Sequence, residues 1–197
     1  MPKPKEQFEE MRLLTIHKLK KSGLFLFARK GVAATNIKEI AKNANVSLGL
    51  IYHYYKSKDE LYLSLANEAM DKSQSVLESF IHMNISAKDK IARFADTFLY
   101  AVHKEDGIYY FILISQLYET DNEEENKKLL DRKKQAIENL AIIVKEGQET
   151  GEFVKGDPFQ LAAMYISATQ GLASFKLMFG EQFEIPDREM LTRILLN

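Results

Sequence analysis

The apolar residues of this chain recur at intervals of three and four positions, which is the spacing of amphipathic α-helices. Within residues 8–30, for example, Leu14, Leu19 and Phe27 follow this spacing until Gly31 ends the segment. Val and Ile form no alternating runs of the kind that half-buried strands require. Prolines occur only at positions 2, 4, 158 and 186, at the edges of the periodic segments. The pattern therefore predicts an all-α protein.

Capping and helix-breaking residues divide the chain into about nine predicted helices. Thr35, Ser47 and Ser57 are predicted to be the N-caps of three of them, because their side-chain oxygens can accept a hydrogen bond from a free backbone N–H. The expected helices span residues 8–30, 36–43, 48–54, 58–80, 87–104, 107–119, 122–150, 157–179 and 187–196.

Residues 35–55 have the pattern of a helix-turn-helix, in which two short helices are joined by a tight turn. The turn needs one residue with a positive φ angle, and Asn45 is the best choice after glycine. Val46 and Ile51 are spaced to point back into the core. Tyr55 precedes the next helix and is expected to be a buried aromatic residue.

The second helix of this motif is predicted to present its outer face to DNA. Tyrosine hydroxyls and a histidine ring can donate to phosphate oxygens, and leucine side chains can pack on thymine methyl groups. A glycine inside a helix costs about 1 kcal/mol relative to alanine, and it suits a backbone that closely approaches another surface. Tyrosines at this spacing also suit core packing, but for Tyr52 and His53 the outer face is favoured. The candidate residues are Ser47, Leu48, Gly49, Leu50, Tyr52, His53 and, at the start of the next helix, Lys58.

The charge distribution indicates the kind of partner, and the composition excludes several kinds of site. The 197 residues are 46% hydrophobic and include no cysteine, which excludes disulfides, Cys-ligated zinc and a thiol nucleophile. Residues 1–60 hold 12 Lys and Arg against 6 Asp and Glu, whereas residues 61–197 hold 15 against 22. A basic first third favours a polyanionic partner, although chance surface patterning also accounts for the charge alone. No signal peptide or membrane-spanning run is evident, so we expect a cytoplasmic protein without a membrane partner.

The C-terminal part carries aromatic and flexible apolar residues with a few polar groups among them, as a small-molecule pocket requires. Plain core packing is the alternative for each single residue. An effector of mostly apolar character is expected, and no cofactor is. The predicted ligand-binding residues are Phe94, Phe98, Tyr109, Tyr110, Phe111, Ile114, Met164, Gln170 and Phe175.

Small residues on one side of the 157–179 helix suggest a close helix contact across a two-fold axis. With the last helix, this side could form a four-helix dimer bundle. The predicted homodimer contacts are Ala163, Ser167, Gly171, Ser174, Leu191, Ile194 and Leu195.

The stretch LFARKGVAATNIKEIAKNANVSLGLIYHYYKSKDELYLSL, residues 26–65, resembles the tetracycline-repressor-like (TetR) family of bacterial transcription regulators. The resemblance implies a three-helix DNA-binding domain over residues 1–56 and a larger helical effector-binding and dimerisation domain over residues 57–197. It also implies a ligand-responsive regulator, typically a repressor, whose dimer reads a palindromic double-stranded operator. By the same resemblance Thr35 and Asn36 join the DNA contacts, with Thr35, Tyr52 and Lys58 on phosphates. Leu48 departs from the polar residue usual at its position and makes the base contacts less polar.

Other classes of function find little support in the sequence. None of the four histidines has another histidine at ligand spacing, so no metal site is predicted. Phosphate-binding glycine loops and nucleophile motifs are absent from the sequence, so an enzyme is not predicted. A helical adaptor that binds only protein would explain the helices but not the basic first third.

Overall fold

The computed structural model describes residues 4–116 and 118–197 and confirms the all-α prediction. Within those ranges the only β feature is a single antiparallel bridge between Phe153 and Leu196. The helices are α1 (Pro4–Lys30), α2 (Ile37–Asn43), α3 (Leu48–Tyr54), α4 (Lys58–Ile81), α5 (Ala87–Val102), α6 (Glu105–Ser115), α7 (Glu123–Glu149), α8 (Pro158–Phe179) and α9 (Arg188–Thr192), with a short 3-10 helix, η1 (Gly180–Gln182), after α8.

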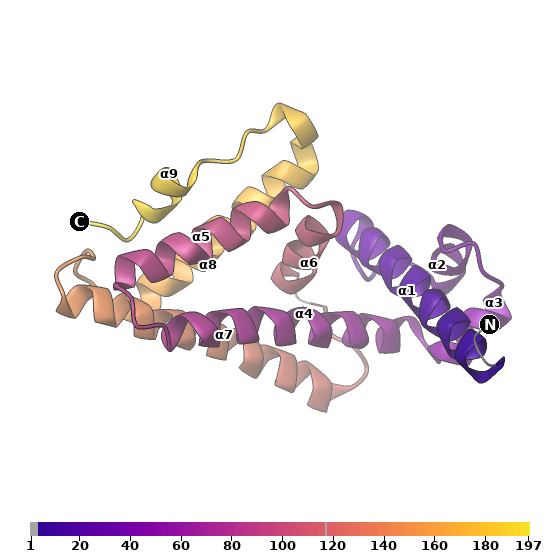
Figure 1. Ribbon diagram of the computed structural model, residues 1–197. Helices are drawn as coiled ribbons and strands as arrows, with labels where there is room; N and C mark the ends of the chain where they lie inside the picture. The colour runs from indigo at the N-terminus through magenta and orange to yellow at the C-terminus, as the bar shows by residue number, and fades with distance from the viewer. Residues whose placement is uncertain (1–3, 117) are drawn as a thin grey trace.

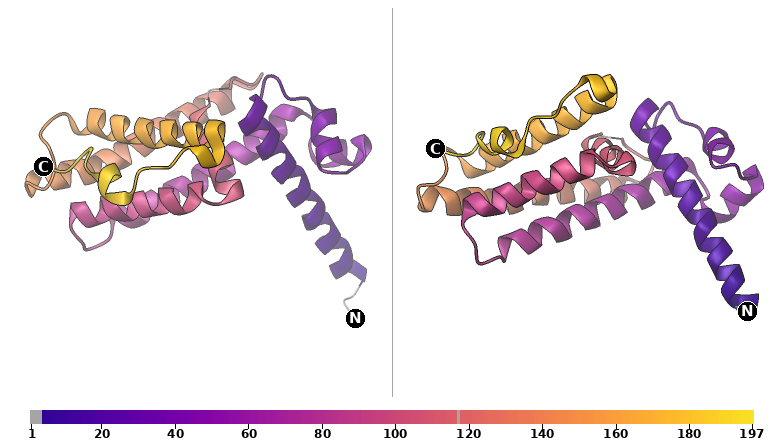
Figure 2. Two further views of the ribbon diagram at one scale, coloured as in Figure 1. Left: turned by 90° about the horizontal axis from the view of Figure 1, so that it is seen from above. Right: turned by 45° about the horizontal axis from the view of Figure 1, so that its top comes forward.

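Helices α1 to α3 form one end of an elongated molecule, and α4 leads from them into the larger helical part (Figure 1). The C-terminal half of α1 packs against α2, α4 and α6, and Leu19 and Phe27 are fully buried there. Its N-terminal half projects away from the body (Figure 2), and the apolar side chains of Phe8 and Met11 are exposed along it.

The larger part is a bundle of the long helices α4, α5, α7 and α8, with the short α6 beside α1 (Figures 1 and 2). Helix α7 packs on both α4 and α8, and α9 returns to pack on α5. No helix within the described ranges is both long and apolar enough to cross a membrane.

Two hydrophobic cores hold these helices together. The first joins α1, α2 and α3 to α4, α5 and α6 through residues such as Ile51, Leu65 and Phe98. The second lies at the far end and includes Leu140 and Tyr165. Because the first core passes from α3 into α4, packing is continuous across the predicted domain boundary between residues 56 and 57. That boundary stays a proposal based on the cap that Ser57 provides for α4.

The predicted helices are close to the observed ones, with three corrections. Asn36, not Thr35, caps α2, because its side chain accepts from the backbone N–H of Glu39. Helix α6 ends at Ser115 instead of 119, where Gln116 turns to an extended conformation. Helix α9 has only five residues, because the chain after Thr192 turns to bridge Phe153 through Leu196.

Candidate nucleic-acid interface and effector cavity

The turn between α2 and α3 has the predicted helix-turn-helix geometry. Asn45 has a φ of 53°, the positive value expected for it. Ile51 is fully buried, which holds the inner face of α3 against the core. The hydroxyl of Ser47 accepts a hydrogen bond of 3.2 Å from the backbone N–H of Leu50 and so caps α3. The backbone thereby fixes which residues of α3 face outward.

The outer face of α3 carries most of the predicted DNA contacts. Tyr52 is 47% exposed, and Leu48 and His53 are also exposed. A Cβ atom added to Gly49 would meet nothing within 4 Å, so the fold itself does not require glycine there. Leu50 is half-buried, and Tyr55 is buried as expected, where desolvation raises its pKa.

Two predicted phosphate contacts are placed differently. Thr35 is only 3% exposed, and its hydroxyl donates to the carbonyl of Gly31 at 2.8 Å, so its side chain does not reach the surface. The Lys58 ammonium is half-buried and donates to the carbonyl of Val32 at 2.7 Å. It also lies 5.4 Å from the ring centre of Tyr118. Lys58 therefore joins the two parts of the chain, and the exposed Asn36 remains at the surface.

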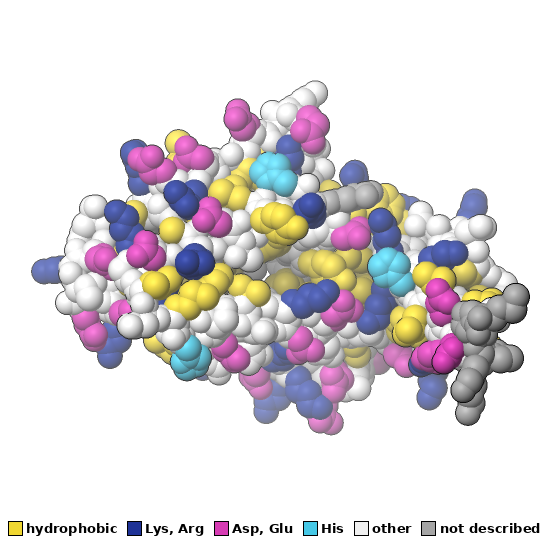
Figure 3. Space-filling model, viewed as in Figure 1, with side chains coloured by type: hydrophobic (Ala, Val, Ile, Leu, Met, Phe, Trp, Pro, Cys, Tyr) yellow, Lys and Arg dark blue, Asp and Glu magenta, His cyan; other side chains and the backbone are white. Residues whose placement is uncertain are grey.

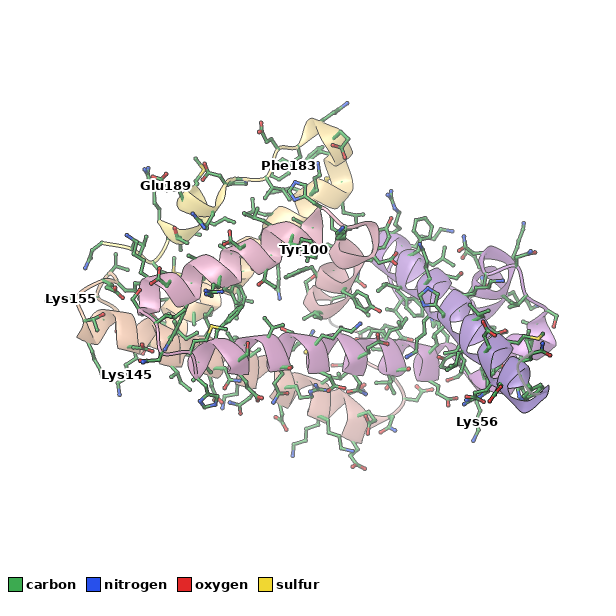
Figure 4. All side chains as sticks on the ribbon, in the orientation of Figure 1. Lys56, Tyr100, Lys145, Lys155, Phe183 and Glu189 are labelled. Atoms are coloured by element: carbon green, nitrogen blue, oxygen red, sulfur yellow. The ribbon has the colours of Figure 1, made fainter. Side chains whose placement is uncertain are left out.

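Three exposed lysines near the motif were missed by the sequence analysis. Lys38 and Lys42 lie on α2, and Lys56 follows α3. The Lys56 side chain points away from the body at the DNA-binding end (Figure 4). Lysines are frequent in this sequence, so only the position of these three beside α3 distinguishes them.

A cavity of about 330 Å³ lies where the two cores meet, between α4, α5, α6, α7 and α8. Figure 3 shows hydrophobic side chains gathered in a hollow between α4, α5 and α6. Of the predicted ligand-binding residues, Phe94, Phe111, Ile114 and Gln170 line the cavity. Its walls also include residues that the sequence analysis did not single out: Met70, Leu77, Lys133, Ala136, Ile137 and Ile166.

Five of the predicted ligand contacts lie elsewhere. Phe98 is buried and meets Phe111 edge to face, with ring centres 5.2 Å apart. Tyr109 packs against Phe25 of α1, also edge to face. The Tyr110 hydroxyl donates to Glu68, and burial raises its pKa to about 12. The remaining two, Met164 and Phe175, are exposed on α8, and Met164 is 61% exposed.

On helix α8, some residues predicted as dimer contacts line the cavity, and some predicted as ligand contacts face outward. Ala163 and Ser167, predicted as dimer contacts, line the cavity, although Ser167 is also exposed. Ser174 is half-buried and donates to the carbonyl of Gln170. The outward face instead carries Met164, Gly171, Phe175 and Met178, and we name these four the α8 outer face.

The dimer contacts predicted on the last helix are also corrected. Leu191 and Leu195 are buried within the chain's own cores, so neither has surface to offer a second chain. Ile194 is half-buried and packs against the second core. The reason is that α9 folds back onto α5 instead of extending beside α8.

No cluster of three or more His, Cys, Asp or Glu side chains placed to hold a metal ion occurs in the part of the chain that the structure describes. The outward helix of a helix-turn-helix, joined to a helical bundle with a mostly apolar cavity, is typical of an all-helical DNA-binding protein. Residues 21–65 match the model of the family described as "Bacterial regulatory proteins, tetR family". The helix-turn-helix segment of the chain is thus similar to this family of transcription regulators.

Similarity to relatives and to solved structures extends beyond this segment. The chain is 28% identical over 145 residues to the fatty acid metabolism regulator protein of Bacillus subtilis (strain 168), covering 73% of each chain. Its fold is similar to that of the MbdR regulator from Azoarcus sp. CIB, with a TM-score of 0.78, 23% identity and coverage of 93% and 97%. It is also similar to FadR from Bacillus subtilis in complex with stearoyl-CoA, with a TM-score of 0.66, 22% identity and coverage of 90% and 94%.

Proposed function

We propose that this chain is a dimeric repressor that binds a palindromic operator in the cytoplasm and is released from it by a small apolar molecule. The observation that carries the proposal is the outer face of α3, which presents Ser47, Gly49, Tyr52 and His53 without a single carboxylate. In a dimer, two such helices would enter successive major grooves about 34–36 Å apart. No catalytic role is proposed.

The contacts with DNA divide into two kinds. We propose that Leu48, Leu50 and His53 lie nearest the base edges, which favours a half-site containing A·T pairs because leucine packs on the thymine methyl group. Tyr52, Asn36 and the exposed lysines Lys38, Lys42 and Lys56 are proposed to bind phosphates. Phosphate contacts position the protein but do not read sequence.

The effector is proposed to occupy the cavity between α4 and α8. Its volume of about 330 Å³ lies in the range of small-molecule sites, and its walls are mostly apolar with a few polar groups. The stearoyl-CoA bound by FadR of Bacillus subtilis contains a long apolar chain, which agrees with an apolar effector here.

The operator experiment measures binding of the protein to DNA upstream of its own coding region, beside a scrambled duplex of equal length. We expect tight binding to the first only, with an affinity that falls steeply as salt rises. Lys56→Ala should weaken binding to both duplexes by a similar factor and make the salt dependence shallower, since it removes a phosphate contact. Lys155→Ala, at the far end of the molecule (Figure 4), is the matched control. Equal and weak binding to both duplexes by the unaltered protein would refute the regulator proposal and favour a helical adaptor.

A further inference from the structure

The one charged side chain among the residues that line the cavity is Lys133 of α7. Its ammonium donates a hydrogen bond of 2.8 Å to the carbonyl of Gln116. The side chain is half-buried, and burial lowers its pKa. No described carboxylate forms an ion pair with it. An ammonium has three donors, so two remain for another partner.

Lys90, which is more deeply buried than Lys133, has a full set of partners within the chain. Lys90 places its ammonium 2.9 and 2.7 Å from the two carboxylate oxygens of Glu146, and a third bond goes to the carbonyl of Ile81. All three of its donors are used inside the protein, as the cost of burying a charge leads one to expect. Lys133 lacks such a counter-ion although it also lies partly out of water. This difference indicates that a ligand supplies the missing negative charge.

The position of Lys133 fixes where that charge would lie. A second hollow of about 450 Å³ adjoins the apolar cavity and shares Leu130 and Lys133 with it. Tyr62, Tyr118 and Asn126 line this hollow, which we name the polar groove. Lys133 thus stands at the junction between the cavity and a hollow lined by more charged side chains.

The charges of the polar groove limit the size of the anion. Glu119 and Glu123 line it together with Lys127 and Lys133, so its formal charge is balanced. A large polyanion there would meet two carboxylates, and like charges at close range repel. A single carboxylate held at Lys133 avoids both of them.

We propose that the effector is an amphiphilic acid whose alkyl or aromatic body fills the apolar cavity and whose carboxylate binds the ammonium of Lys133. This rests on the proposed function, since it specifies the effector of that same cavity. The carboxylate oxygens take the two unused donors of Lys133. The apolar body covers Phe94, Phe111 and Ile114.

The test compares three probes with the same chain: decanoate, methyl decanoate and decanoyl-CoA. Binding is measured by calorimetry at pH 8, where the free acid is ionised. Decanoate is expected to bind the unaltered protein roughly tenfold or more tightly than its ester, because a hydrogen bond to a charged group is lost in the ester. Equal affinities for acid and ester would overturn the proposal. Decanoyl-CoA binding more than tenfold tighter than decanoate would overturn it too, in favour of phosphate recognition.

Variants of Lys133 test whether its ammonium binds the carboxylate of the ligand. Lys133→Met should abolish the preference for acid over ester, and Lys133→Arg should keep most of it. Lys134→Met is the matched control, because Lys134 is the next residue of α7 and is exposed beside Glu138. A preference that survives in Lys133→Met would place the anion elsewhere and refute the assignment. If Lys133→Met fails to fold, the comparison of acid and ester on the unaltered and Lys133→Arg proteins still decides.

The same preparations are tested for binding to the upstream DNA without a ligand. If the unaltered protein does not bind the upstream DNA, the proposal that it is a regulator is refuted, and its preference for acid over ester can still be measured. Intact DNA binding together with no preference for the acid would refute only the role of Lys133.

Discussion

At Gly49 the fold would accept alanine, whereas a DNA partner that approaches the backbone closely would favour glycine. Nothing in the protein lies within 4 Å of a Cβ atom added there, and its φ angle is not positive. Alanine would therefore fit the fold and would favour the helix. We therefore propose that the surface of operator DNA approaches the backbone of α3 closely at this glycine.

Gly49→Ala is expected to stabilise the protein and to weaken its binding to DNA. The free energy of unfolding should rise by up to about 1 kcal/mol from helix propensity. Operator affinity should fall about tenfold, because a displaced helix loses base contacts worth about 1–3 kcal/mol. Urea denaturation and fluorescence anisotropy measure the two effects. Ser75→Ala on α4 should bring only a gain in stability, and unchanged operator affinity in Gly49→Ala would contradict the close approach.

Tyr165 presents a different case at the same scale. Its side chain is fully buried in the second core, and its hydroxyl has no hydrogen-bond partner among the described residues. A buried hydroxyl without a partner costs roughly 1–3 kcal/mol. Tyr165→Phe keeps the ring that meets Phe94 and removes only the hydroxyl.

The expected result for Tyr165→Phe is a rise of about 1 kcal/mol in the free energy of unfolding. The measurement is the urea midpoint at an unchanged slope. Tyr100→Phe, at an exposed tyrosine (Figure 4), should leave stability unchanged. A loss of stability in Tyr165→Phe would mean that the hydroxyl is satisfied in solution.

At the scale of single elements, the sequence predicted helices well and predicted their faces unevenly. On α3 a buried Ile51 and a cap at Ser47 fix the orientation, so Tyr52 and His53 were correctly expected to face outward. Helix α8 is apolar on nearly every side, so its periodicity could not show which side meets the cavity. Met164 was therefore assigned to the cavity, although it faces outward, and Ser167, assigned to the dimer contact, is exposed but also lines the cavity.

Two further features could not be read from periodicity at all. Lys133 lies in the run Arg132-Lys133-Lys134, where nothing local separates the residue that enters the cavity from its neighbours. The cavity itself is built by five helices, and such long-range contacts leave no local signal. The return of α9 onto α5 likewise depends on the bridge between Phe153 and Leu196.

The contact between α1 and α4 includes a carboxylate whose titration can be followed. Glu68 accepts from Lys72 of its own helix and from Lys20 of α1, with the Lys20 bond at 2.9 Å. Burial alone raises the pKa of Glu68, but these hydrogen bonds outweigh it and hold that pKa at about 2. The folded state thus prefers the ionised carboxylate, and the stabilisation is present above the ordinary pKa of 4.5.

This contribution should disappear as the pH falls from about 4.5 through about 2. At neutral pH we expect Glu68→Gln to lower the free energy of unfolding by about 1–2 kcal/mol after discounting for solvent screening. The difference between the two proteins should shrink on acidification, as urea denaturation at several pH values would record. Glu78→Gln, on an exposed part of α4, should show no such trend. A difference independent of pH would show that the carboxylate is not preferentially ionised in the fold.

For the whole molecule, the outstanding surface is the α8 outer face. Met178 is 70% exposed, and the ring of Phe175 lies 6.2 and 5.6 Å, centre to centre, from the tilted rings of Phe179 and Phe183. Phe183 lies just beyond the end of α8 (Figure 4). Together with Met164 and the open side of Gly171, these residues form an apolar surface along one helix. Such a surface suits a two-fold contact with a second copy.

We expect Phe175→Glu to convert the proposed dimer to a monomer and to reduce operator affinity at least tenfold, because one recognition helix then binds without the other. Light scattering after size exclusion measures the mass. Phe8→Glu, on the projecting half of α1, alters a similarly exposed apolar residue and should leave the mass unchanged. A dimer that persists in Phe175→Glu would place the contact on another face.

The hydrogen bond from Lys133 to Gln116 is the first of a series of contacts that runs from the cavity to the turn between α1 and α2. Two residues beyond Gln116, the Tyr118 hydroxyl donates to Asp59 at 2.9 Å, and the ring lies beside Lys58, which holds the carbonyl of Val32 in the turn between α1 and α2. An acid bound at the two remaining donors of Lys133 pulls on the same ammonium that makes the first bond of this series. The coupling free energy between two binding sites is reciprocal. If the acid lowers the affinity for operator DNA by a given factor, operator DNA must lower the affinity for the acid by the same factor.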